Sequence, residues 1–248
     1  MKTIVIAAGY ATRLYPLTEN FPKPLLEIGK STILDRLLDD IDTIPEVDGH
    51  IVVTNHKFAG IFRKWAEKRP NVTILDDGTS TNETRLGAVR DLILALETFG
   101  IDEDILVVAA DNILDFSLRG FVEEFRRRGT SMIMCYHEPE LCKLQRTGVI
   151  EVDANMKVLQ MQEKPQAPVS HWAVPPFYIY RREDLPLIRT SIAGGCGFDA
   201  PGNLAHYLVD KTIVHAWPMP GARFDIGSLD TYEEARRRYA VQRIAEKS

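Results

Sequence analysis

The sequence predicts an α/β fold: a Rossmann-like, doubly wound, mostly parallel mixed sheet with helices on both faces and a β-hairpin added in the second half. Short apolar runs alternate with amphipathic helical patterns through the first half, which is typical of parallel βαβ units. The length of 248 residues is enough for one large domain with a substantial core. Hydrophobic residues make up 45% and charged residues 26% of the chain, as in ordinary globular proteins.

The first predicted strand is the apolar run Ile4–Ala8, which stops at Gly9. The proline-stiffened loop that follows carries Thr12, Arg13 and Lys23. Open α/β sheets bind ligands at the carboxyl ends of their strands, and glycine lets the backbone approach a bulky anion. Arginine and lysine are the usual cations for holding phosphates. We therefore predict a phosphate-binding loop, against the simpler alternative of a surface loop with scattered charges.

Two helix–strand pairs are predicted next. A helix with one apolar stripe is capped by Ser31 and leads to a strand over 51–54, and a second helix over 58–66 leads to a strand over 72–75. The string Gly29–Thr32 looks like the end of a Walker A loop. Pro24 stands where that motif requires its first glycine and no strand directly precedes it, so we predict a turn and a helix cap.

Polar residues follow the next two predicted strand ends. Residues 76–84 contain no apolar side chain and form either a ligand loop or an exposed connection before a helix over 85–99. The strand over 105–110 ends at Asp111, at the same edge of the sheet as Gly9. A carboxylate there suits Mg²⁺, which prefers oxygen ligands and bridges to phosphates. A simple Asp-Asn turn is the alternative interpretation.

The second half departs from the βαβ pattern. A helix over 117–128 and a strand over 131–136 precede a predicted hairpin, with strands over 147–152 and 157–164. Beyond the hairpin we predict a strand over 174–180, helices over 183–190 and 198–210, and a strand over 213–217. The last helix is expected to begin with a capping box of Thr231 and Glu234.

Four segments together resemble the sugar-phosphate nucleotidyltransferase family, in particular its glucose-1-phosphate thymidylyltransferase-like members with a single catalytic domain. The segments are Gly9–Lys23, with Thr-Arg-Leu, Pro-x-Thr and Pro-Lys in that order; Asp111 after its strand; Glu163-Lys164-Pro165; and Asp225-Ile226-Gly227. The chain departs from the family where a second glycine is replaced by Ala11, and where Thr-Gly before an aromatic residue is replaced by Pro175-Pro176. It also lacks the glutamine of thymidylyl-transferring members near Leu86.

The resemblance implies that an NTP and a sugar 1-phosphate give an NDP-sugar and pyrophosphate, with Mg²⁺ as cofactor. It implies that Arg13 and Lys23 are catalytic, with Arg13 on the β- and γ-phosphates and Lys23 on the α-phosphate. The implied nucleotide-binding residues are Ala8, Gly9, Ala11, Thr12, Gly87 and Asp111; the acceptor-binding residues are Gly148, Glu163 and Lys164; and the metal ligands are Asp111 and Asp225.

The resemblance also divides the single domain, 1–248, into a nucleotide-binding half (1–136), an acceptor-binding elaboration (137–228) and a C-terminal helix (229–248). Two other functions stay open. One is a cytidylyltransferase that acts on a non-sugar phosphate or phosphonate such as phosphocholine. The other is a non-catalytic nucleotide-binding or regulatory module, although such modules tend to lose the cations and metal carboxylates that this chain keeps.

Composition narrows the expected partners. A net charge of −5 argues against non-specific binding to nucleic acid, and no apolar run approaches the length of a membrane span. Three cysteines at spacings that suit neither zinc nor a disulfide framework indicate a reducing compartment. We therefore expect a cytoplasmic protein that binds small phosphorylated molecules, with homo-oligomerisation left open.

Overall fold

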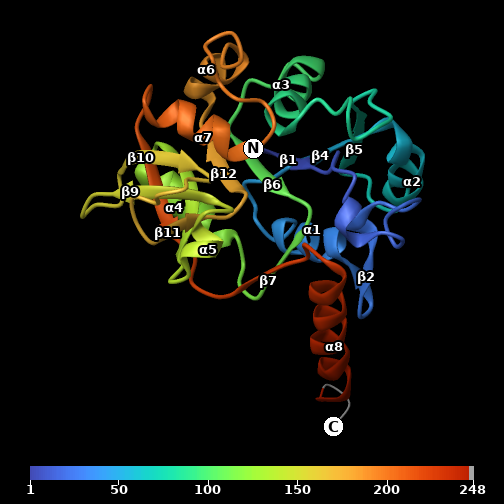
Figure 1. Cartoon of the computed structure of the whole chain (residues 1–248). Coiled ribbons are helices and arrows are strands. Elements are labelled where there is room, and N and C mark those ends of the chain that lie inside the picture. Colours follow the sequence, from blue (N-terminus) through green and yellow to red (C-terminus); the bar gives the residue numbers. More distant parts are fainter. Residues whose placement is uncertain (246–248) are drawn as a thin grey trace.

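One ten-stranded sheet runs through both halves of the chain in this computed structural model, which describes residues 1–245, with side chains through residue 239 (Figure 1). The strand order is β10-β9-β11-β8-β12-β6-β1-β4-β5, and β13 pairs with β8. The strands are β1 (Lys2–Ile6), β4 (Gly49–Thr54), β5 (Val72–Asp76), β6 (Ile105–Ala109), β8 (Ser131–His137), β9 (Gly148–Val152), β10 (Val158–Glu163), β11 (Trp172–Val174), β12 (Phe177–Tyr180) and β13 (Val214–Pro218).

The part of the sheet that carries the N-terminal loop is parallel. β1 lies between β4 and β6, with Ile4 beside Ile51 and Val107, and β5 continues the parallel order beyond β4. The carboxyl ends of these four strands therefore share one edge of the sheet, where their loops meet. β10, β11 and β12 run against the other strands. The predicted fold class, a mostly parallel mixed sheet with an added hairpin, is confirmed.

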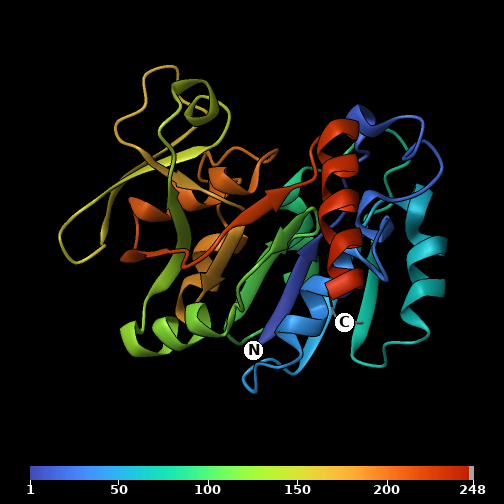
Figure 2. The same cartoon turned by 90° about the horizontal axis from the view of Figure 1, so that it is seen from below.

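Helices cover both faces of the sheet (Figures 1 and 2). One core packs the sheet against α1 (Ile33–Ile41), α2 (His56–Ala66) and α4 (Arg119–Arg128). The core on the opposite face packs it against α3 (Ala88–Thr98), α6 (Leu185–Arg189) and α7 (Pro201–Val209). Each helix buries one apolar stripe, as its spacing of apolar residues requires. No helix in the described range 1–245 is both long enough and apolar enough to cross a bilayer.

Smaller elements bring the N-terminal loop against the C-terminal segment. They are the 3₁₀ turns η1 (Thr12–Leu14) and η2 (Lys23–Leu25), the pair β2 (Glu27–Ile28) and β3 (Ser31–Thr32), the pair β7 (Asn112–Leu114) and β14 (Arg223–Asp225), and α5 (Leu141–Leu144), η3 (Arg182–Asp184) and α8 (Leu229–Ala245). A third buried cluster joins Leu14 and Ile28 to Ile226 and to Tyr232 of α8. α8 extends away from the body beyond this cluster (Figure 1).

Two predicted helix caps are wrong by a few residues. Ser31 belongs to β3, and Thr32 caps α1 instead, in a capping box in which its hydroxyl accepts from the Asp35 amide at 3.0 Å. Thr231 does not begin α8. The helix starts at Leu229, and the Ser228 hydroxyl accepts from the Thr231 amide at 3.3 Å. In both cases a neighbouring hydroxyl residue with equal capping ability takes the position.

The single strand predicted over 174–180 is two strands. β11 ends at Val174 and pairs with β8 and β9, whereas β12 begins at Phe177 and pairs with β6 and β8. Pro175 and Pro176 lie at the break because proline has no N–H to donate to a sheet. The two prolines therefore move the chain from the hairpin end of the sheet to its centre.

Candidate active site

The loop after β1 is held in place by its own polar contacts. Ala11 has left-handed φ and ψ angles of 48° and 41°, and its carbonyl accepts from the buried Thr18 hydroxyl at 2.8 Å. A Cβ atom added to Gly9 would meet nothing within 4 Å, so the backbone there borders open space. Gly9, Ala11, Lys23 and Asp111 are among the residues that line a cavity of about 120 Å³ at this point. This is where a ligand could approach the loop backbone.

Lys23 joins three segments of the chain that are distant in sequence. Its ammonium group donates to the Asp111 Oδ2 atom at 2.9 Å and to the Ile226 carbonyl at 2.8 Å. Only 13% of the lysine side chain is exposed. The loop, the end of β6 and the segment after β14 thus meet at one ammonium group.

Asp225 lies beside Asp111 because of a short antiparallel ladder. In this ladder Asp225 of β14 stands opposite Asn112 of β7, and the Ile226 amide donates to the Asp111 carbonyl at 3.0 Å. Desolvation, followed by the charge of Asp111, raises the pKa of Asp225, while Arg223, Lys23 and Arg13 oppose this shift. The structure therefore gathers the two aspartates and Lys23 at one place, and Arg13 is near enough for its charge to act on Asp225.

The two aspartates fit a magnesium site. Mg²⁺ is typically bound in proteins by one or two carboxylates, with waters and substrate phosphates as the remaining ligands. Two neighbouring carboxylates, one with a raised pKa, are a donor set that a divalent cation would stabilise. Within residues 1–245 no cluster of three or more His, Cys, Asp or Glu side chains is arranged to hold a metal, so a closed, all-protein site is not found.

A wider cavity of about 610 Å³ begins on the other side of Asp111. Asp111 lines both this cavity and the smaller one at Gly9, so the two meet at its carboxylate. The wider cavity is lined by Asp225 and Arg223 of β14, by Tyr136, by the loop that contains Arg146, and by Pro175 and Pro176. The prolines that break the predicted strand therefore form part of its wall.

The predicted acceptor residues lie next to this wider cavity. Gly148 stands opposite Glu163 in the β9–β10 ladder, and a Cβ atom on Gly148 would be 3.4 Å from the Glu163 Oε2 atom. Burial raises the pKa of Glu163. Lys164 adopts a left-handed φ of 49°, and its amide donates to the carbonyl of Thr147, a cavity residue, at 3.1 Å. Its ammonium group is 3.9 Å from Glu163, and 56% of its side chain is exposed.

Comparison with known proteins identifies this arrangement. Residues 2–242 match the sequence model of a family described as nucleotidyl transferase. The chain belongs to the nucleotidyl transferase family. This confirms the family that the four segments together predicted.

Relatives of this nucleotidyl transferase include several sugar-phosphate enzymes. The chain is 26% identical to the UTP–glucose-1-phosphate uridylyltransferase AglF of Haloferax volcanii, and the match covers 96% of both chains. It is 26% identical to a glucose-1-phosphate adenylyltransferase of Fervidobacterium nodosum, covering 93% of this chain and 59% of the relative. It thus spans nearly all of AglF but little more than half of the second relative.

Two solved structures share the nucleotidyl transferase fold. A UDP-glucose pyrophosphorylase complexed with UDP-glucose matches with a TM-score of 0.81 and 18% identity, covering 97% of this chain and 98% of the other. A putative glucose-1-phosphate thymidylyltransferase from Bacillus anthracis matches with a TM-score of 0.80 and 22% identity, covering 97% and 95%.

Gly87 has a packing role in this nucleotidyl transferase. Its φ is 92°, and a Cβ atom there would lie 2.5 Å from the Phe198 carbonyl oxygen. The amides of Ala88 and Val89 donate to the carbonyls of Asp199 and Phe198 at 3.1 and 3.0 Å. Helix α3 therefore begins at Ala88 rather than Arg85, because residues 198–199 bind its first amides. A contact between Gly87 and a nucleotide stays a prediction.

Three residues at the nucleotidyl transferase site were not predicted: Asn112, Tyr136 and Arg223. The Asn112 side-chain amide donates to Asp111 Oδ1 at 2.6 Å, and its oxygen accepts from Arg223 Nη1 at 2.6 Å. The short strands β7 and β14 carry these contacts, and neither strand was predicted. One signal in the sequence could have found Arg223. Side chains alternate between the two faces of a strand, so residue 223 lies on the same side as residue 225, a predicted metal ligand.

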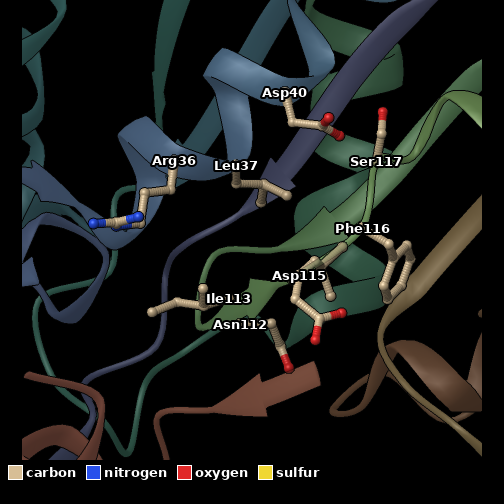
Figure 3. Close-up of a pocket in the computed structure, with 9 residues that line it drawn as sticks. Arg36, Leu37, Asp40, Asn112, Ile113, Asp115, Phe116 and Ser117 are labelled. Carbon is tan, nitrogen blue, oxygen red and sulfur yellow. The ribbon is translucent and has the colours of Figure 1, made fainter. Parts of the chain in front are cut away.

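Another cavity, of about 280 Å³, lies between α1 and residues 112–117 (Figure 3). Its acidic side chains already have backbone partners. Asp40 accepts from the Leu118 amide at 2.8 Å, and Asp115 accepts from the Ala222 amide at 2.6 Å. Figure 3 shows the Asn112 side chain pointing away from this cavity, toward β14. The cavity therefore lies on the α1 side of β7, whereas the predicted site lies on the side of β7 that faces β14.

Proposed function

We propose that the chain transfers a nucleotidyl group from an NTP to a sugar 1-phosphate and releases pyrophosphate, in a reaction that depends on Mg²⁺. The observation that carries this proposal is the position of the Lys23 ammonium group. It is hydrogen-bonded to Asp111, next to Asp225, at the junction between a narrow cavity at the glycine loop and a wide one. The names of the relatives, which include uridylyl- and adenylyltransferases of glucose 1-phosphate, support the same reaction.

In this reaction an oxygen of the sugar phosphate attacks the α-phosphorus of the NTP. The bond between the α-phosphorus and the bridging oxygen to the β-phosphate breaks, and pyrophosphate leaves. Positioning and charge stabilisation carry such transfers, without a covalent protein intermediate. Lys23 stabilises the α-phosphate, Arg13 holds the leaving phosphates, and Lys164 neutralises the acceptor phosphate. Amides of residues 8–12 complete the cradle around the NTP.

Asp111 and Asp225 are the residues that would hold Mg²⁺. When bound there, the ion neutralises phosphate charge and fixes the orientation of the NTP. The pKa of Asp225 is raised by desolvation and by Asp111, so without a cation this aspartate binds its proton more tightly than an ordinary aspartate. A dication between the two carboxylates would relieve that repulsion.

Pyrophosphate release should be measured across a matrix of four NTPs and several phosphorylated acceptors, with and without EDTA. The acceptors should include glucose 1-phosphate and phosphocholine. We expect release with a sugar 1-phosphate, loss of activity in EDTA and recovery with added Mg²⁺. Turnover of phosphocholine with CTP and of no sugar phosphate would replace the proposal with the cytidylyltransferase alternative. Nucleotide binding without turnover of any pair would indicate a non-catalytic module.

A further inference from the structure

Arg223 is a partly buried cation in the wall of the wide cavity. It lies on β14, two residues before Asp225, and only 15% of its side chain is exposed. Its Nη1 atom donates to Asn112 Oδ1 at 2.6 Å, and its Nη2 atom donates to the Tyr136 hydroxyl at 3.3 Å. The guanidinium carbon is 5.3 Å from the centre of the Tyr136 ring. These contacts hold the group in one orientation.

The guanidinium group keeps donors for a ligand. Arginine has five N–H donors, and the contacts found for Arg223 among the described residues use two of them. The nearest carboxylate oxygen, Asp225 Oδ2, is 3.9 Å away, which is beyond hydrogen-bonding distance. A planar fork of free donors matches the oxygens of a phosphate group. Because Arg223 lies beside Asp225, its donors are next to the carboxylates that would hold the metal.

The charges around the cavity favour a negatively charged ligand once a dication is bound. The acidic side chains are Asp111, Glu138 and Asp225, and the basic ones are Lys143, Arg146 and Arg223. The Lys23 ammonium group, bonded to Asp111, adds a positive charge to these three negative and three positive side chains, so with a dication on the two aspartates the site would be net positive. A phosphate monoester carries about two negative charges near neutral pH. Such a site would attract the phosphate of an acceptor.

The three cations differ in how they are held. Lys143 forms an ion pair with Glu140 at 2.5 Å, and Arg146 is exposed at the rim. Arg223 alone among these three is packed on an aromatic ring and linked through Asn112 to Asp111. It is the cation in this cavity whose position is fixed relative to the proposed metal site.

We propose that Arg223 binds the phosphate of the acceptor as a second cation beside Lys164, with Asn112 and Tyr136 as positioning residues that aim its fork. This proposal rests on the proposed function. Lys164 supplies an exposed, flexible point charge, whereas Arg223 supplies a fixed orientation. The two cations together define where the attacking phosphate oxygen stands relative to the NTP.

Steady-state kinetics of Arg223→Ala and Arg223→Lys test the proposal, with each substrate varied in turn and the best acceptor of the wild type used throughout. Loss of charge-assisted hydrogen bonds to a phosphate should raise the KM for the acceptor about 10- to 100-fold in Arg223→Ala. The KM for the NTP should stay within about twofold, because only the acceptor contact is removed. Arg223→Lys keeps the charge but loses the fork, and should lie between the wild type and Arg223→Ala.

Arg36→Ala is the matched control. Arg36 also packs on a tyrosine ring, 4.6 Å from the centre of Tyr239, and donates to a carbonyl at 2.8 Å, but it lies outside the wide cavity. Its removal should leave both KM values unchanged. Free guanidinium should restore part of the acceptor affinity of Arg223→Ala and should not affect Arg36→Ala. An unchanged acceptor KM in Arg223→Ala, or an equal rise in both KM values, overturns the proposal.

A measurement on the wild type covers the case in which the Arg223 variants do not fold. The acceptor should protect Arg223 from an arginine-specific dicarbonyl reagent, as read by mass spectrometry, whereas the NTP alone should not. Equal modification of Arg223 with and without acceptor counts against the proposal. A wild type that turns over no phosphorylated acceptor defeats the proposed function itself. An active wild type with unprotected Arg223 defeats only this further inference.

Discussion

The two ends of the crevice are built differently. The end proposed to bind the NTP is a cavity of about 120 Å³ at the carboxyl edge of parallel strands, beside a loop fixed by a left-handed residue and a buried threonine. The end proposed for the acceptor is a cavity of about 610 Å³, walled by the antiparallel strands β7 and β14, a proline pair and an exposed loop. Every NTP carries the same triphosphate, so a narrow, rigid end suits its binding. The wide end is where acceptors of different shape can be accommodated.

Two lysines show the same contrast. Lys23 is 13% exposed and has two hydrogen bonds to fixed groups, whereas Lys164 is 56% exposed and 3.9 Å from its nearest carboxylate partner. A fixed cation lowers the free energy of a transition state without reorganising at the moment of reaction. A mobile surface cation contributes mainly to binding. The contrast predicts different kinetic consequences for the two lysines.

The largest expected effect is that of Lys23→Ala. Removing a fixed cation at the reacting phosphate should lower kcat by about 1,000-fold, with the fold retained by circular dichroism. Lys164→Ala should instead raise mainly the KM for the acceptor, by about 10-fold. Lys30→Ala, at an exposed position, is the control and should behave like the wild type. Near-wild-type kcat in Lys23→Ala would remove the basis of the catalytic assignment.

Asp225→Asn tests the junction between the two ends. Losing one of two metal carboxylates should lower activity at millimolar Mg²⁺ by about 100-fold, and higher Mg²⁺ should recover part of it. Because the pKa of Asp225 is raised, protons should compete with Mg²⁺ at this carboxylate. The apparent Mg²⁺ affinity of the wild type should therefore rise as pH increases through that raised pKa. A Mg²⁺ affinity that is the same in wild type and variant would contradict the metal assignment.

The sequence predicted the NTP end better than the acceptor end for a physical reason. Each NTP-end element is local: an apolar run with a glycine at its end predicts β1 and its loop, and the run before Asp111 predicts β6. The acceptor wall depends on pairings between distant short strands. No local pattern marks β14 pairing with β7, so the place of Arg223 beside Asn112 was missed, although Asp225, two residues later, was predicted as a metal ligand.

A pair of buried aspartates outside the two cavities gives the next largest effect. Burial, and then the charge of Asp77, raises the pKa of Asp91 in α3 to about 7. Its side chain is 3% exposed, and its Oδ1 atom has no hydrogen-bond partner within the described chain. At the amino end of β8, burial would raise the pKa of Asp184, but hydrogen bonds from Arg181 and Ser131 lower it.

These two shifts have opposite consequences for stability. A raised pKa means that the contribution of Asp91 is present at pH below about 4 and is lost as pH rises to about 7. Asp91→Asn should thus stabilise the fold by about 2 kcal/mol at pH 8 and by little at pH 4, after the cost of burying an amide. Asp184→Asn should destabilise the fold at pH 8 and almost as much at pH 4, because a lowered pKa keeps the contribution of Asp184 until pH falls below about 4. Denaturant unfolding of both variants at pH 4 and pH 8 measures this, and parallel pH profiles would contradict it.

The smallest effect concerns backbone strain, which occurs at both ends. Ala11 and Lys164 are non-glycine residues with φ angles of 48° and 49°. A left-handed non-glycine residue costs about 1–2 kcal/mol, while glycine loses about 0.4–1 kcal/mol through the greater freedom of the unfolded chain. Ala11→Gly and Lys164→Gly should therefore each stabilise the fold by about 0.5 kcal/mol, or about 1–2 °C in Tm.

Activity separates the two glycine variants. Ala11→Gly leaves every side chain that contacts phosphate in place, and its kcat and both KM values should stay within about twofold of the wild type. Lys164→Gly removes a cation, and the gain in stability should come with the same rise in acceptor KM as in Lys164→Ala. Calorimetry and kinetics on the same preparations make the comparison. If Ala11→Gly lowered Tm, the left-handed conformation of the loop would not be the source of strain, because only the Cβ atom has been removed.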